Sequence, residues 1–317
     1  MTDQAVIDDA ARKAFRALQK RARAEHAGNT QPLLTMYAVE SFLRRLALSE
    51  HAEQMVLKGG MLMAAEGIRR MTKDADLSTH DVPNDEETVR RVVEQICSLE
   101  PDPHDGIVID PASIRTEITR EDGEYRGVRC KPAAKLAQAR ISFALDFSFG
   151  DPGISTLIEL DSVVDRPPVP LRAYPLALNL AEKLVTAMQR RETSTRDRDF
   201  ADLWVASRRH VIDAAELRRN VMVVANHRQQ PIITMAEALR NMPDRQREYA
   251  AMVERMSYLS PPPKLWTDLL DGVIRFADPL LLNDDGSLTS WDPERLEWAR
   301  AAISRPAAPR HVGRSTG

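Results

Sequence analysis

At 317 residues, with 43% hydrophobic and 29% charged side chains, the chain has the composition of a globular protein and room for one large domain or two smaller ones. It contains no run of eighteen apolar residues, and its start lacks a basic segment followed by an apolar one, so we expect neither a membrane span nor a secretion signal. The net charge of −3 does not suggest a nucleic-acid binder, and two cysteines outside any Cys-x-x-Cys motif favour a reduced cytoplasmic protein.

The first half of the chain predicts a domain in which helices and short strands are mixed. Helices are expected at about 4–25, 33–47, 61–67 and 82–97, and strands at 55–57, 107–110, 114–120, 126–130, 141–149 and 157–160. Gly59 and Gly60 follow the first strand, where they let the backbone turn sharply and leave room for a phosphate to approach. The helix after them would direct its N-terminal amides toward that phosphate.

The second half of the chain predicts helices after a proline-rich linker at 164–170. Apolar spacing places these helices at about 176–191, 199–209, 213–226, 232–241, 245–257 and 263–277. We therefore expect an N-terminal helix (1–30), a core (31–165), a helical C-terminal domain (166–303) and a disordered tail (304–317). The fold class is α/β (α+β).

Three acidic residues predict a metal site in the core. Asp74 and Asp76 are two apart in a predicted strand, which places both carboxylates on one face. Asp146 lies within another predicted strand, and if the two strands pair, three carboxylates converge. Oxygen ligands of this kind suit Mg²⁺ together with substrate phosphates. The alternative is that Asp74 and Asp76 cap a loop and Asp146 faces outward.

A second group of charged residues lies in the predicted helical domain. Lys183 on a helix can neutralise a triphosphate as a point charge, and Arg196 or Arg198 can hold a phosphate with two hydrogen bonds. Asp199 and Asp202 are three apart and share a helix face, from which they could orient Lys183. An ordinary surface network of ion pairs is the alternative.

In combination, these motifs resemble the AbiEii/AbiGii toxin family of nucleotidyltransferases, and the resemblance covers roughly residues 30–300. The matching stretches are Met36–Leu43 with Arg45 and Leu46, Val56–Gly60, Thr72–Leu77, Tyr125–Arg129, Leu145–Asp151, Ala181–Lys183, the Arg-x-x-Asp-x-x-Asp pattern of Arg196, Asp199 and Asp202, and Trp291 with Trp298. Two positions depart from the pattern: Gly60 stands where Ser is frequent, and Arg198 stands where Lys is common. Neither departure removes an expected metal ligand.

The resemblance implies a nucleotidyltransferase-like core with a mixed sheet, followed by a helical C-terminal region. It also implies NTP as substrate, Mg²⁺ or Mn²⁺ as cofactor, an antitoxin protein as partner, and the 3′ end of tRNA as acceptor. In residue terms it assigns metal binding to Asp74 and Asp76, contact with the triphosphate to Lys183, and the acid of the last motif to Asp199.

The resulting hypothesis is a metal-dependent transferase that joins a nucleotide to an RNA hydroxyl and releases pyrophosphate. Its expected catalytic residues are Asp74, Asp76, Asp146, Lys183 and Asp199, with the first three as metal ligands. Its expected substrate-binding residues are Lys58, Gly59, Gly60, Thr72, Lys73, Arg196 and Asp202. Two alternatives remain open: transfer to a protein or small-molecule hydroxyl, and nucleotide binding by a regulator that transfers nothing.

Overall fold

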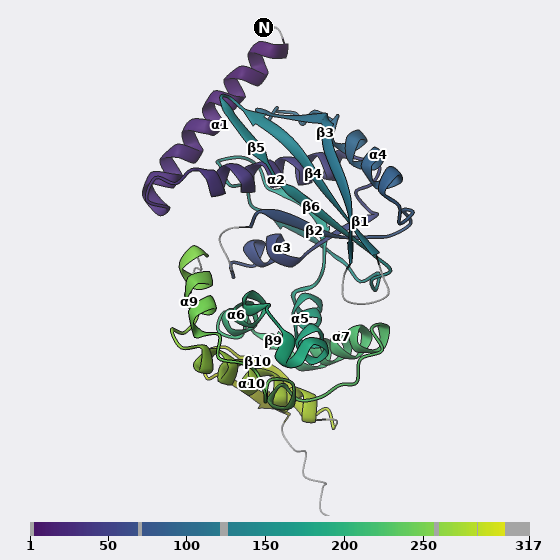
Figure 1. Cartoon of the computed structure of the whole chain (residues 1–317), viewed down its shortest axis with the longest axis vertical. Helices are drawn as coiled ribbons and strands as arrows, with labels where there is room; N and C mark the ends of the chain where they lie inside the picture. Colours follow the sequence, from purple (N-terminus) through teal and green to yellow (C-terminus); the bar gives the residue numbers. More distant parts are fainter. Residues whose placement is uncertain (1–2, 69–71, 121–125, 257–259, 284, 302–317) are drawn as a thin grey trace, which may run out of the picture.

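The structure, a computed structural model, describes residues 3–68, 72–120, 126–256, 260–283 and 285–301. A large sheet with its helices lies above a mostly helical C-terminal region in Figure 1. The helices of the first part are α1 (Asp3–Glu25), α2 (Gln31–Leu48), α3 (Gly59–Ala65) and α4 (Glu86–Cys97). Its strands are β1 (Met55–Lys58), β2 (Asp74–Thr79), β3 (Ile107–Arg120), β4 (Arg126–Leu136), β5 (Ala139–Ser142), β6 (Ala144–Phe149), β7 (Thr156–Leu160) and β8 (Val169–Ala173).

These strands form one eight-stranded sheet in the order β3-β4-β6-β2-β1-β8-β7, with β5 beside β4. β2 pairs with β6 in parallel, as β1 does with β8, and the other pairs are antiparallel. The expected α/β class with a mixed sheet is therefore confirmed. β2 and β6, which carry the predicted acids, are neighbours inside the sheet, and both of them have a partner strand on either side.

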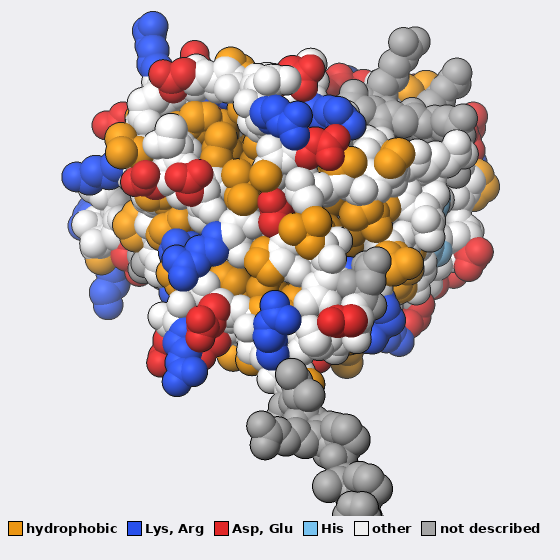
Figure 2. All heavy atoms as spheres, turned by 90° about the horizontal axis from the view of Figure 1, so that it is seen from below, with side chains coloured by type: hydrophobic (Ala, Val, Ile, Leu, Met, Phe, Trp, Pro, Cys, Tyr) orange, Lys and Arg blue, Asp and Glu red, His pale blue; other side chains and the backbone are white. Residues whose placement is uncertain are grey.

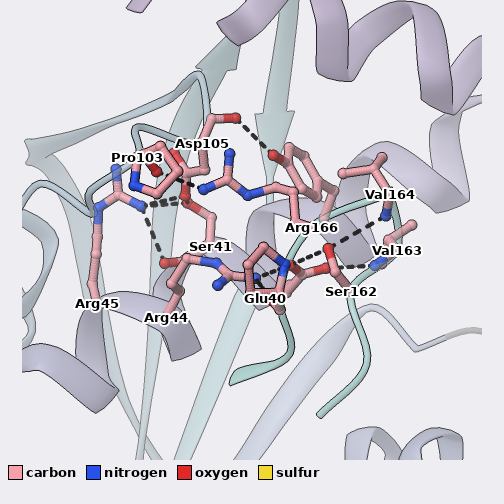
Figure 3. A network of polar contacts seen from close by, with 12 residues as sticks. Glu40, Ser41, Arg44, Arg45, Pro103, Asp105, Ser162, Val163, Val164 and Arg166 are labelled. Carbon is pink, nitrogen blue, oxygen red and sulfur yellow. Dashed lines mark hydrogen bonds and ion pairs between the residues drawn. The ribbon is translucent and has the colours of Figure 1, made fainter. Parts of the chain in front are cut away.

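Helix α2 ties distant loops to the sheet through a buried polar network (Figure 3). Its Arg45 forms an ion pair with Asp105 at 2.8 Å, and both side chains are almost fully buried. Its Glu40 accepts hydrogen bonds from the Ser162 hydroxyl and the Val163 N–H, each at 2.7 Å. Buried charges of this kind are tolerated because partners replace the lost water. The segments before β3 and after β7 are thus held against one helix.

Two of the predicted strands differ from the structure. The segments 107–110 and 114–120 are one strand, β3, whose register shifts between Asp110 and Arg115. There the Ser113 hydroxyl accepts from the Ala133 N–H at 2.9 Å and bridges the bulge to β4. The predicted strand at 141–149 is instead two strands, separated at the buried Phe143, with β5 pairing with β4 and β6 with both β4 and β2.

The predicted linker at 164–170 is wrong at its end, because β8 already begins at Val169. β8 pairs with β7 and, through Leu57 and Ala173, with β1. The large sheet therefore continues past residue 165 into the segment expected to open the helical domain. Pro170 is accommodated opposite Glu159 in the β7–β8 ladder.

The C-terminal region is mostly helical but also contains a small sheet that the sequence pattern did not predict. Its helices are α5 (Leu176–Arg190), α6 (Asp197–Ala206), α7 (Ala214–His227), α8 (Met235–Ala238), α9 (Gln246–Arg255) and α10 (Trp266–Leu282). Its strands are β9 (Ile212–Asp213), β10 (Leu288–Asp292) and β11 (Glu297–Arg300), in the order β11-β10-β9. Trp291 and Trp298 face each other across β10 and β11 and pack on Phe276 of α10. The tail expected to be disordered, 304–317, lies outside the described residues.

The side of the C-terminal region that faces away from the large sheet carries hydrophobic side chains among charged ones (Figure 2). The exposed large hydrophobic residues of this region include Val211, Met222, Val223, Ile232, Leu265 and Leu282. Such mixing is ordinary for a protein surface. In the ranges that the structure describes, no helix is long and apolar enough to span a membrane. Cys97 and Cys130 are buried and free.

Candidate active site

A cleft of about 680 Å³ lies between the large sheet and the C-terminal region. One wall comes from β1, β2, β4 and β6, and the other from α5, α6 and the chain around the end of α7. A volume of this size is within the range of small-molecule sites. The two groups of charged residues that the sequence keeps about 40 to 120 positions apart therefore face one cleft.

The predicted acids lie on adjacent strands of the sheet wall. Asp74 and Asp76 alternate along β2 with Ala75 and Leu77, which are fully buried. β6 runs parallel to β2, and Asp146 stands directly opposite Asp76. The strand pairing that the predicted convergence required is therefore confirmed, and all three acids line the cleft.

The Gly59-Gly60 turn fits closely around Asp76. Gly59 has a φ of +65°, and a Cβ added there would lie 1.9 Å from Oδ2 of Asp76. The Gly60 N–H donates a hydrogen bond to the same oxygen at 3.2 Å. Any side chain at position 59 would thus occupy the space of the carboxylate. The Gly59-Gly60 turn, which we expected to approach a phosphate, therefore positions the carboxylate of Asp76.

Negative charge accumulates at this point of the sheet. Burial, followed by the carboxylates of Asp74 and Asp146, raises the pKa of Asp76 to about 6, although Lys58 and the Gly60 N–H oppose the rise. The Asp74 carboxylate accepts a hydrogen bond from the Thr72 hydroxyl at 2.8 Å. A cation placed between Asp74 and Asp76 would stabilise both charged forms.

Asp146 has its own cationic partner, Arg129 of β4. The guanidinium donates to both carboxylate oxygens, at 2.6 and 2.8 Å, and the two residues are opposite each other in the β4–β6 ladder. Such a two-point pair is among the stronger side-chain contacts. The hydrogen bonds to Asp146 raise the pKa of Arg129, so the guanidinium stays charged.

The residues present fit a hard divalent cation at Asp74 and Asp76, whose oxygens are the ligands that Mg²⁺ and Mn²⁺ prefer. Among the described residues, no group of three His, Cys, Asp or Glu side chains is arranged as a complete metal cluster. Both oxygens of Asp146 are engaged by Arg129. Each oxygen keeps a second lone pair, so Asp146 could join the ligand set while its contacts with Arg129 remain.

The helical wall presents Lys183 held between two acids. Its ammonium lies 2.6 Å from Asp199 and 2.9 Å from Asp202, so the interpretation that these acids orient Lys183 agrees with the contacts. Lys183 is 7% exposed and Asp202 is fully buried. Arg196 is half exposed and lies 3.8 Å from Asp199. Asp202 thus supports the wall from behind, whereas Lys183, Arg196 and Asp199 line the cleft.

The remaining predicted substrate-binding residues are placed differently. Lys58 lines the cleft, but its ammonium is 2.7 Å from Asp151 and 3.5 Å from Glu182. Thr72 is buried and contacts Asp74. Lys73 is exposed and is not among the residues that line the cleft.

The cleft is also lined by charged residues that were not predicted as site residues, among them Arg129, Asp151 and Glu182. All three fall within stretches that match the family motifs, next to or near the predicted residues, and that proximity was the only signal available. Their roles depend on pairings across the sheet and the cleft, and Lys58 and Glu182 are 124 positions apart. Spacing within one element cannot reveal such contacts.

Comparisons with known proteins agree with this architecture. The family described as "Nucleotidyl transferase AbiEii toxin, Type IV TA system" matches residues 41–271. The solved structure of MenT4, a nucleotidyltransferase toxin from Mycobacterium tuberculosis H37Rv, is similar with a TM-score of 0.53 and 18% identity, covering 90% of this chain and 92% of that one. JHP933 from Helicobacter pylori, with a TM-score of 0.39 and 18% identity over 60% of this chain and 72% of its own, is too distant for structural inference.

No curated protein sequence matches the chain significantly. The family match covers well over half of the chain, and the fold and the motif order agree with it. The chain therefore belongs to the AbiEii nucleotidyltransferase toxin family of type IV toxin–antitoxin systems.

Proposed function

We propose that this toxin transfers a nucleotide from an NTP to a hydroxyl of an RNA acceptor, the 3′ end of a tRNA, in a reaction that requires Mg²⁺ or Mn²⁺. The observation that carries the proposal is the pairing of two walls: Asp74 and Asp76 on the sheet, and Lys183 with Arg196 on the helices, around one cleft. Phosphoryl transfer requires carboxylates that bind a metal ion and cationic side chains that bind the phosphates.

In this reaction the acceptor oxygen forms a bond to the α-phosphorus, the bond to the bridging oxygen breaks, and pyrophosphate leaves. Asp74 and Asp76 would hold the divalent ion, which offsets charge on the phosphates when bound. Lys183, oriented by Asp199 and Asp202, faces the triphosphate, and Arg196 at the rim can contact its outer phosphates. Fixed charges of this kind require little rearrangement during the reaction.

Asp146 is the proposed third acid. Arg129 engages both of its oxygens, and each oxygen keeps a second lone pair with which Asp146 can bind the metal or take the proton of the attacking hydroxyl. Release of one oxygen by Arg129 would open a further position. Arg129, which is about one-third exposed, can then turn toward a phosphate. On substrate binding, Arg129 would thus exchange one contact with Asp146 for a contact with a phosphate.

The tRNA acceptor rests on the family resemblance. Arg196 and Arg198, which line the cleft, are exposed cations. Both NTP and tRNA are cytoplasmic, and we place the toxin there. Membership of a toxin–antitoxin family implies a partner antitoxin.

The test is incubation of the purified protein with total tRNA, Mg²⁺ and each α-³²P-labelled NTP in turn, beside an Asp76→Ala variant. We expect label on tRNA with the intact protein and none with the variant. Label on protein or on a small compound would replace the RNA acceptor with another hydroxyl. NTP binding without release of pyrophosphate would identify a regulator instead. Full transfer by Asp76→Ala would refute the role of the acid pair.

A further inference from the structure

Helix α5 contacts the turn that holds Asp76. Asn179 and Glu182 are three residues apart and share one face of the helix. Their partners are consecutive residues of the sheet wall: the Asn179 amide donates to the Gly59 carbonyl at 3.4 Å, and Glu182 lies 3.5 Å from the Lys58 ammonium. We call this pair of contacts the α5 bridge.

Lys58 is well anchored on its own side of the cleft. Its ammonium lies 2.7 Å from Asp151, and its side chain and that of Asp151 are each about nine-tenths buried. Asp151 also accepts from the Ser148 hydroxyl at 2.5 Å, and the ammonium lies 5.6 Å from the centre of the Tyr174 ring. The charge of Lys58 lowers the pKa of Asp151 to about 2 against the opposing effect of burial.

The α5 bridge links residues that adjoin two groups of the proposed chemistry, Asp76 and Lys183. Lys58 is opposite Asp76 in the β1–β2 ladder and immediately precedes Gly59, whose missing Cβ makes space for the Asp76 carboxylate. On the other wall, Glu182 immediately precedes Lys183. The Lys58–Glu182 ion pair is therefore adjacent to Asp76 across the strand ladder and to Lys183 along the chain.

We propose that Lys58 and Glu182 are positioning residues, which set the distance across the cleft between the Asp74–Asp76 pair and Lys183. This inference rests on the proposed function for its kinetic consequence. The Lys58 ammonium lies farther from Glu182 than from Asp151, at 3.5 against 2.7 Å, so the contact with Glu182 is the one that parts when the walls separate, while Lys58 stays with Asp151. Arg228, 3.3 Å from Glu182, holds the other side of Glu182 against the end of α7.

The competing role for Lys58 is direct contact with a substrate phosphate, as its place beside the Gly-Gly turn first indicated. The two roles differ in what Glu182 does. A phosphate-binding lysine would gain from removal of Glu182, because a competing acid disappears. If Lys58 is a positioning residue, removal of Glu182 takes away its partner across the cleft, so substitution of Glu182 and substitution of Lys58 should lower the transfer rate alike.

The experiment compares Lys58→Met, Glu182→Met and the double variant with the intact protein. The exposed Glu53, which pairs with Arg172 on the surface, supplies Glu53→Met as a matched control. We expect each bridge variant to lower kcat on the order of 10-fold with KM for NTP changed less than about 2-fold, because a displacement near 1 Å can cost up to about 100-fold. The double variant should be no slower than the slower single variant, since coupled residues are not additive.

A second measurement does not depend on activity. Hydrogen–deuterium exchange should increase in α5 and in the β1–α3 turn of both single variants and remain unchanged in Glu53→Met. If the intact protein transfers no nucleotide, the proposed function fails, and the hydrogen–deuterium exchange of α5 and the β1–α3 turn alone tests the α5 bridge. Unchanged exchange in both segments would overturn the bridge. A raised KM in Lys58→Met together with a lowered KM in Glu182→Met would overturn it in favour of phosphate binding.

Discussion

Replacement of Gly59 by alanine should abolish transfer without touching a charged residue. The added Cβ would lie 1.9 Å from Oδ2, 2.6 Å from Cγ and 2.8 Å from Cβ of Asp76. Non-bonded carbon atoms rest about 3.5–4.0 Å apart, so the carboxylate must turn away from the cleft or the backbone must move by more than about 1 Å. A displacement of this size at a reacting group costs about 100-fold in rate.

The stability cost of Gly59→Ala is expected to be modest. A left-handed backbone conformation such as φ +65° costs an ordinary residue about 1–2 kcal/mol. With an unfolding entropy of roughly 2.1 cal/mol/K per residue, this corresponds to a fall in Tm of roughly 1.5–3 °C for a chain of 317 residues. We therefore expect a folded protein with kcat lowered at least about 100-fold, measured by transfer kinetics beside thermal unfolding.

Gly286→Ala is the matched control. Gly286 has a φ of +67°, and a Cβ there meets no atom within 4 Å. The two variants share the backbone penalty, and only the first has the clash with Asp76. Equal transfer rates in both variants would refute the steric reasoning and, with it, the view that the turn positions the acid.

Three further outcomes are expected. Because the pKa of Asp76 is raised from 3.8 to about 6, its ionisation destabilises the metal-free protein as pH rises through this interval, by about 3 kcal/mol at pH 7. In the presence of EDTA, the Asp76→Asn variant should therefore have a higher Tm than the intact protein at pH 7 and the same Tm at pH 4. Lys183→Met removes the ammonium that contacts Asp199 and the buried Asp202, and it should lower the free energy of unfolding in urea by about 3–5 kcal/mol, with partial recovery of stability but not of transfer in the double variant with Asp202→Asn. Because the pKa of Asp151 is lowered from 3.8 to about 2, its charge stabilises the fold above pH 4, and this stability is lost as pH falls toward 2. The Asp151→Asn variant should therefore have a free energy of unfolding about 2 kcal/mol lower at pH 7. Equal stability of the two proteins at that pH would contradict the strength assigned to the contact of Asp151 with Lys58.

The sequence predicted the parts of the site that lie within one element. Asp74 and Asp76 could be placed on one face because a strand repeats every two residues and buried neighbours flank them. Asp199 and Asp202 could be placed on one face of a helix for the equivalent reason. In both cases local periodicity alone decides which way a side chain points.

The parts that the sequence did not predict depend on pairing between elements. Arg129 meets Asp146 only because β4 and β6 are adjacent in a particular register, which local periodicity does not reveal. The small sheet around Trp291 was missed because β9 has two residues and β10 and β11 are short. Strands of this length carry too few residues for alternation to be recognised.

The charge balance of the cleft indicates where a cation is needed. Asp146 is neutralised by Arg129, and Lys183 is held by two acids of α6, so these groups are compensated by the chain itself. Asp76 accepts a hydrogen bond from a backbone N–H, and burial, followed by the neighbouring acids, raises its pKa to about 6. A divalent ion that binds there should therefore raise Tm in the intact protein, by mass action, and should raise it less in Asp76→Asn. Equal shifts in both proteins would place the ion elsewhere and would detach the metal from the acid pair.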